Sequence, residues 1–130
     1  MSNFNAVTLP MHRDAVAPDG SDVRILLGLP GGGMAHFELC PGEVSRAVTH
    51  RTVEEIWFFL SSHAQMWRSH GGAGEIVDVF PVVCLTISLG THFQFRATGE
   101  QALAAVGVTM PPWPGEDEAY AVEGPWRATV

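Results

Sequence analysis

Short stretches of alternating apolar and polar residues run through most of this chain, separated by glycine and proline. No stretch of ten or more residues places apolar side chains at helical spacing, so the pattern favours strands over helices. Period-two alternation and turn residues predict strands near Val23–Gly28, Met34–Cys40, Val44–His50, Ile56–Leu60, Ala64–Arg68, Glu75–Phe80, Cys84–Leu89, Phe93–Ala97 and Ala102–Met110. This regular spacing is typical of an all-β sandwich or barrel.

The remainder of the chain predicts little regular structure. A helix over Glu116–Val122 and a loop are equal alternatives after the proline-rich turn Pro111–Pro114. The glycines Gly31–Gly33 precede a strand pattern rather than a helix, so they predict a turn and not a phosphate-binding loop. His70–Gly74 likewise predicts a loop between two strands.

The strand Ile56–Leu60 is apolar at every position, which predicts that both of its faces are covered. Trp57 and Phe59 are in phase with Glu55 and are expected to line the interior. The opposite side chains, Ile56, Phe58 and Leu60, need a second layer, which is either ordinary sandwich core or another subunit. We therefore expect a homodimer.

Composition sets the class of protein. The 130 residues fit one domain, 1–130, with a core over about residues 23–110, an N-terminal arm and a C-terminal extension. With 46% hydrophobic and 16% charged residues, the chain can bury a core. The net charge of −7 and the lack of a basic run argue against nucleic acid or a membrane surface as partner. No apolar run is long enough to span a bilayer and the N-terminal residues have no leader pattern, so a cytoplasmic location is expected.

The two cysteines, Cys40 and Cys84, each lie in an apolar segment. This setting predicts buried, reduced and slowly reactive thiols rather than a disulfide.

One segment carries a recognisable motif. The sequence Pro41–Ser62, PGEVSRAVTHRTVEEIWFFLSS, resembles the first signature of the cupin family: Gly, five residues, His-x-His, three or four residues, Glu, six residues, Gly. Gly42, His50 and Glu55 match it, whereas Val48 takes the first histidine position and Ser62 the closing glycine.

The second cupin signature, Gly, five residues, Pro-x-Gly, two residues, His, three residues, Asn, can be placed on residues 82–97. Gly90 matches, and the departures are Val82, Ser88, Phe93 and Ala97. The resemblance covers about half the chain, and the tail Met110–Gly115 is also similar to that of some members. It implies a single cupin-type double-stranded β-helix, that is, a jelly-roll barrel.

Cupin enzymes typically hold one divalent metal, often Fe, Mn, Ni or Zn, with three histidines and one glutamate. Only His50 and Glu55 remain here, and Val48 and Phe93 put hydrocarbon in the vacated places. His92 could be a third ligand only if a β-bulge reversed the alternation that points His92, Gln94 and Arg96 outward. We therefore favour no cofactor; a metal-dependent oxygenase or isomerase using these residues is the alternative.

Without a metal, His50 is expected to form a hydrogen-bonded pair with Glu54 or Glu55 that stabilises the imidazolium. An apolar setting would raise the pKa of such a carboxyl group toward neutrality, so acid–base catalysis is a further hypothesis. His36 is expected to face solvent, and His12, His63 and His70 are given no role.

Together these features predict an apolar pocket with one polar pair, built from Val48, His50, Glu55, Trp57, Phe93 and Phe95. It suits a small, largely apolar or planar organic molecule that His50 and Glu55 orient. A barrel that is only a scaffold for assembly is the remaining alternative. The extension with Trp113, Trp126 and the acids Glu116, Asp117 and Glu118 is expected to form a lid over the barrel mouth or to lie across a dimer interface.

Overall fold

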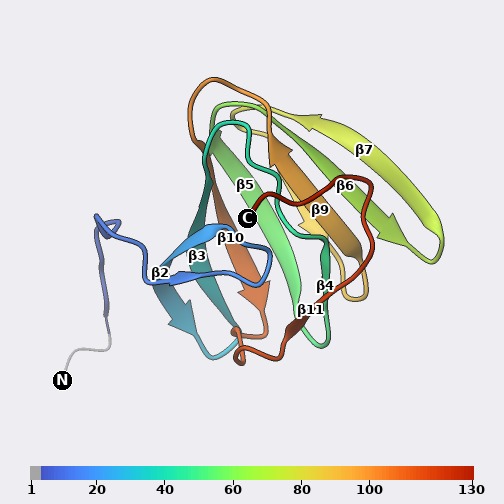
Figure 1. Ribbon diagram of the computed structural model, residues 1–130. Coiled ribbons are helices and arrows are strands. Elements are labelled where there is room, and N and C mark those ends of the chain that lie inside the picture. The colour runs from blue at the N-terminus through green and yellow to red at the C-terminus, as the bar shows by residue number, and fades with distance from the viewer. Residues whose placement is uncertain (1–3) are drawn as a thin grey trace.

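The computed structural model describes residues 4–130, and strands make up all the regular structure of that part (Figure 1). One antiparallel sheet has the order β1-β2-β3-β10-β5-β8, and the other has the order β11-β4-β9-β6-β7. The first comprises β1 (Ala15–Val16), β2 (Asp22–Leu29), β3 (Gly32–Leu39), β10 (Leu103–Met110), β5 (Glu54–Ser61) and β8 (Cys84–Ile87). The second comprises β11 (Ala119–Ala121), β4 (Val48–His50), β9 (His92–Ala97), β6 (Ala64–His70) and β7 (Ala73–Val79). Within residues 4–130 there is no helix of the length and apolarity that crossing a membrane requires.

The core lies between the two sheets and follows from the alternation within each strand. On β5, Trp57 and Phe59 are each 1% exposed, while the residues between them face outward. From β9, Phe93 and Phe95 meet Trp57 edge-on, with ring centroids 5.9 and 5.3 Å away. Such aromatic pairs add to the free energy gained by burying their apolar area.

The predicted strands are present, with some changes of length. The segment predicted as Val44–His50 is a strand only from Val48 onward, because Val44 forms no more than an isolated bridge to Arg96. The short edge strands β1 and β11 were not predicted. The option of a helix at Glu116–Val122 is wrong, because Ala119–Ala121 pairs with β4 at the edge of the second sheet.

Two turns follow the glycine pattern. Pro30 and Gly31 join β2 to β3, and Gly71 and Gly72 join β6 to β7, as their sequences predicted.

The backbone keeps all four glycine positions of the two cupin signatures. Residues 42, 62, 82 and 90 have φ angles of 80°, 67°, 71° and 83°, respectively. This left-handed region favours glycine, yet Ser62 and Val82 adopt it here. The proposed register of both signatures is therefore supported by conformation where the residue types have changed.

The prediction of buried cysteines is wrong, since Cys40 and Cys84 are free and exposed. On β8, Leu85 and Ile87 take the inward positions, so the alternation turns Cys84 outward. Cys40 follows the end of β3, where the neighbouring Glu43 carboxylate raises the pKa of the thiol.

The prediction that His36 faces solvent is also wrong. It lies on the outer face of β3, as its parity indicated, but only 4% of it is exposed. Arg24 is its direct partner on β2, and its Nδ1 lies 3.9 Å from Glu38. Burial lowers the pKa of His36.

The C-terminal segment covers the outer face of the second sheet. Gln94 is 1% exposed because its amide donates to the carbonyls of Ser45 and Trp126 and accepts from the Trp126 N–H. Arg96 stacks on the Trp126 ring, 4.3 Å from the ring centroid. Gln94 and Arg96 therefore point outward as predicted, but into protein rather than solvent.

Candidate ligand-binding site

A cavity of about 660 Å³ lies at one end of the space between the sheets. Its wall is formed by residues from β1, β2, β3, β4, β5, β9, β10 and β11 and from the segments that follow β1 and β10. Of the pocket residues predicted from the sequence, five line it: Val48, His50, Glu55, Trp57 and Phe93. The sixth, Phe95, is not part of the wall and packs on Trp57 in the core.

Aromatic rings form the inner wall. Phe37 of β3 stacks on Trp57 with centroids 4.9 Å apart and planes 13° apart. Gly107 on β10 leaves room for this pair, since a Cβ there would lie 2.9 Å from Phe37 and 3.0 Å from Trp57. The stack is thus held rigidly by three neighbouring strands.

Glu55 projects from β5 into this apolar setting and is 4% exposed. Burial raises the pKa of its carboxyl group to about 8; the charges of Asp19 and Glu118 add to this effect, and a hydrogen bond from Trp57 opposes it. That bond runs from the Trp57 Nε1–H to Oε2 over 2.5 Å, and no other described residue bonds to the carboxyl group. Near neutral pH, Glu55 is therefore mostly a protonated acid with Oε1 uncommitted.

His50 lies beside it at the end of β4, 7% exposed and held between two rings. Phe93 and Trp113 meet the imidazole edge-to-face at 5.4 and 5.2 Å. Burial lowers its pKa, while the Glu118 charge and the Val53 backbone oppose that shift only in part. Nδ1 nevertheless has no partner with hydrogen-bond geometry, so the ring is a neutral, unsatisfied polar group.

The predicted hydrogen bond from His50 to Glu54 or Glu55 is absent among the described residues. Glu54 is exposed on the other face of β5 and accepts from the Leu89 N–H at 3.3 Å. Glu55 is committed to Trp57 instead. The prediction was wrong for two reasons. Neighbouring residues on a strand point to opposite faces, so Glu54 points away from His50. Glu55 points inward but accepts a hydrogen bond from the Trp57 indole instead.

Glu118 is the acid whose charge acts on His50, and the sequence did not indicate this. Although burial opposes its ionised form, hydrogen bonds from the Thr52 hydroxyl and the Thr52 and Val53 N–H groups lower its pKa. The carboxylate thereby ties the C-terminal segment to the turn between β4 and β5.

Asp19 is a second acid that the sequence did not single out. It follows β1, lines the cavity and is 5% exposed. Burial raises its pKa, and hydrogen bonds from the Ser21 N–H and hydroxyl, 2.9 and 2.6 Å long, together with Arg46, oppose that shift. Pro18-Asp19-Gly20-Ser21 is a recognisable turn sequence, but nothing in it signals burial against the cavity.

The C-terminal extension forms part of the rim. Pro112, Trp113, Glu116 and Ala119 line the cavity, and Trp113 is 38% exposed. Trp126 lies elsewhere, on the outer face of the second sheet. The first half of the extension therefore lines the cavity, and its second half packs on the outer face of the second sheet.

The resemblance implies a divalent metal, and the donor set does not fit one. The ligand positions at 48 and 93 face each other across β4 and β9 and hold buried Val and Phe. His92 is not part of the cavity wall, and β9 pairs with β6 without the register shift that would turn it inward. Within residues 4–130, no group of three His, Cys, Asp or Glu side chains could hold a metal ion.

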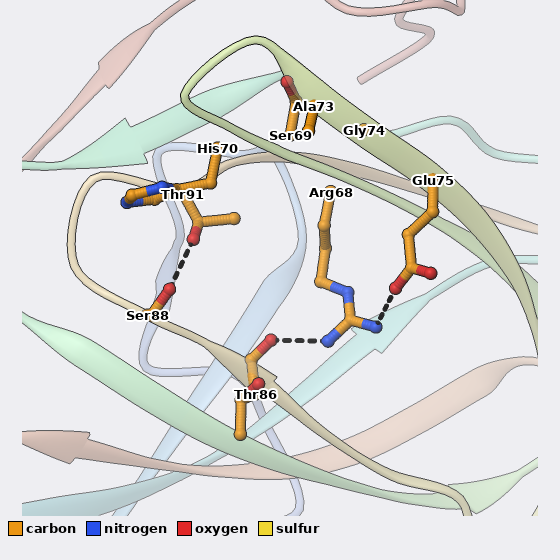
Figure 2. A pocket seen from close by; sticks show the side chains of 9 residues that line it. All are labelled: Arg68, Ser69, His70, Ala73, Gly74, Glu75, Thr86, Ser88 and Thr91. Atoms are coloured by element: carbon orange, nitrogen blue, oxygen red, sulfur yellow. Dashed lines mark hydrogen bonds and ion pairs between the residues drawn. The ribbon is translucent and has the colours of Figure 1, made fainter.

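A second hollow of about 420 Å³ lies on the surface beside β6 and β7 (Figure 2). Arg68 donates to the Thr86 carbonyl at 2.8 Å and to Glu75 at 2.7 Å, while its buried Nε–H has no partner. The Ser88 and Thr91 hydroxyls bond to each other. The interior cavity is larger and is lined mainly by aromatic and aliphatic side chains, so it is the better candidate site.

No family model matches the sequence, and no curated protein matches it. Solved structures match its fold. A protein with a double-stranded β-helix domain from Klebsiella pneumoniae is 14% identical with a TM-score of 0.66, covering 80% of this chain and 85% of that one. KdgF from Halomonas sp. is 14% identical with a TM-score of 0.65, covering 76% and 86%.

The capsular polysaccharide assembling protein CapF from Staphylococcus aureus is 16% identical with a TM-score of 0.71. The match covers 92% of this chain but only 35% of CapF. At these identities the likeness shows the fold alone. The fold is a double-stranded β-helix of the cupin type, as the motif resemblance implied.

Proposed function

We propose that this double-stranded β-helix binds one small, largely apolar organic molecule in the cavity between its sheets. One observation carries the proposal: an aromatic and aliphatic cavity of about 660 Å³ contains three polar side chains that are each more than nine-tenths buried and incompletely bonded. They are Asp19, His50 and Glu55. Buried polar groups normally have hydrogen-bond partners, and a ligand would supply the missing ones.

Apolar and polar residues of the cavity wall contact different parts of the ligand. Its volume falls within the range of about 300–1,000 Å³ that is usual for small-molecule sites. Trp57 and Phe93 are among the aromatic side chains that line the space for the body of the ligand. His50 and Glu55 fix its orientation through directional hydrogen bonds. The alternative function, a metal-dependent enzyme, has no comparable support, because the described residues do not supply three ligands for a metal ion.

Isothermal titration calorimetry with two neutral probes, 2-phenylethanol and 1-octanol, tests the proposal. Ala35 on β3 lines the cavity, so Ala35→Phe should occupy it and weaken binding at least about tenfold. Ala73→Phe, on the exposed β7, is the matched control and should leave the affinity unchanged. Thermal unfolding of both variants confirms that they fold.

Equal affinities for the wild type and a folded Ala35→Phe variant would place binding outside this cavity and overturn the proposal. If neither probe bound at millimolar concentration, that result would also contradict the proposed binding function.

A further inference from the structure

Building on the proposed function, we infer that the ligand is a cation: an ammonium group carried on an apolar body. Asp19 and Glu55 would face the charge, and the aromatic wall would surround it. The inference specifies the class of molecule that the cavity takes.

The ionisable side chains that line the cavity are acids, apart from His50. Asp19 and Glu55 lie in its wall, and Glu116 lies at its rim. The sequence contains no lysine, and none of its arginines is among the described residues that form the wall. His50 is the one basic side chain of that wall, and burial favours its neutral form. An anionic ligand would thus enter a site with acids and no cation to receive it.

Each of the two buried carboxyl groups keeps one oxygen uncommitted. Both hydrogen bonds to Asp19 come from Ser21 and end on Oδ1, which leaves Oδ2. The bond from Trp57 ends on Oε2 of Glu55, which leaves Oε1. An ammonium group has only hydrogen-bond donors to offer, and both oxygens can accept from it once their carboxyl groups are ionised.

The charge of Asp19 also disfavours the ionised form of Glu55. Other groups relieve this only in part. Arg46 acts on Asp19 from outside the cavity wall, where its Nε–H donates to the Val130 carbonyl. Glu118 adds further negative charge, although its own oxygens are bonded to Thr52 and Val53. A cation between Asp19 and Glu55 would favour the ionised form of both.

The aromatic wall suits the same ligand. Trp57, Phe93 and Trp113 all line the cavity, and Trp113, which is 38% exposed, has accessible ring surface that would attract an organic cation. The hydrocarbon surface of β2 and β3 can take the apolar body. A bare metal ion would gain nothing from that surface, and the described residues do not supply three ligands for one.

Calorimetry at pH 7 with two sets of probes of matched shape tests the inference. The first set is 2-phenylethylamine, 2-phenylethanol and phenylacetate; the second is octylamine, 1-octanol and octanoate. In at least one set, the amine should bind about tenfold tighter than the alcohol, and the carboxylate should bind weakest. Asp19→Asn and Glu55→Gln should each remove most of the preference for the amine while leaving the alcohol within about twofold.

Glu54→Gln is the matched control, because Glu54 is an exposed acid on the same strand outside the cavity wall. It should change none of the affinities. The ranking of the three charges in the wild type tests the inference even if a cavity variant does not fold.

If the alcohols bind as tightly as the amines, the inferred charge is wrong while the proposed binding function stands. If none of the six probes binds at millimolar concentration, both fail. An amine that binds tightly and keeps its full preference in folded Asp19→Asn and Glu55→Gln variants would show that these carboxyl groups do not hold the charge.

Discussion

Glu55 illustrates how one residue can couple stability to pH. Its pKa is about 8 in the folded protein against 4.5 for an ordinary glutamate, chiefly because it is buried. Between these values the unfolded chain has lost this proton and the folded protein keeps it. Ionisation therefore favours the unfolded state increasingly as the pH rises, and stability falls across this window.

Glu55→Gln replaces the titratable carboxyl group with an amide, whose oxygen can still accept the hydrogen bond from Trp57. Relative to wild type, the free energy of unfolding of the variant should rise by on the order of 3 kcal/mol from pH 5 to pH 8. Urea unfolding at several pH values measures this. Glu54→Gln, at an exposed position, should run parallel to the wild type. Parallel curves for Glu55→Gln as well would show that Glu55 ionises normally.

At the scale of elements, the turns retain the conformation of the cupin signatures even where glycine has been replaced. Val82 follows β7 with a φ of 71° and is 71% exposed, so its side chain gains little from burial. A β-branched residue is strained in this left-handed region. Its N–H still donates to the Phe59 carbonyl at 2.9 Å, and this bond holds the turn against β5.

Val82→Gly should therefore stabilise the protein by about 1 kcal/mol, since glycine adopts this φ without strain and keeps the N–H. Val83→Gly is the neighbouring control and should destabilise it, because Val83 packs against the core and has no positive φ. Denaturant unfolding of both variants gives the comparison. A loss of stability in Val82→Gly would contradict the strain argument.

At the scale of the whole molecule, the first sheet leaves an apolar outer face. Ile56, Phe58 and Leu60 are 43%, 39% and 45% exposed. Val106 and Val108 of β10 lie directly beside Phe58 and Ile56 and extend this face. We propose that a second copy of the chain covers this face.

Sedimentation at micromolar concentration should then give twice the 14.0 kDa mass of the chain. Phe58→Asp should return the mass to that of one chain by placing a charge in the interface. Ile76→Asp, at an exposed position on β7 in the other sheet, should leave the dimer intact. A wild-type mass of one chain would rule the dimer out.

The sequence by itself determined the strands other than the short edge strands β1 and β11, and which side chains of those strands face inward. Alternation is a local property of an extended chain, so Trp57, Phe59, Phe93 and Phe95 could be placed inside from their spacing alone. The motif resemblance predicted that His50 and Glu55 line one cavity, and both do so.

Only the tertiary structure decided which segments cover the outer faces of the strands and which charged groups lie close together. Alternation gives the side of a strand but not its neighbours, so the cover over His36 and Gln94 could not be predicted. Asp19 lines the cavity and Glu118 acts on it through its charge, and the two come from segments almost a hundred residues apart that carry no periodic pattern. The electrostatics of the cavity, and with them the inferred charge of its ligand, depend on those long-range contacts, because burial and nearby charge set each pKa.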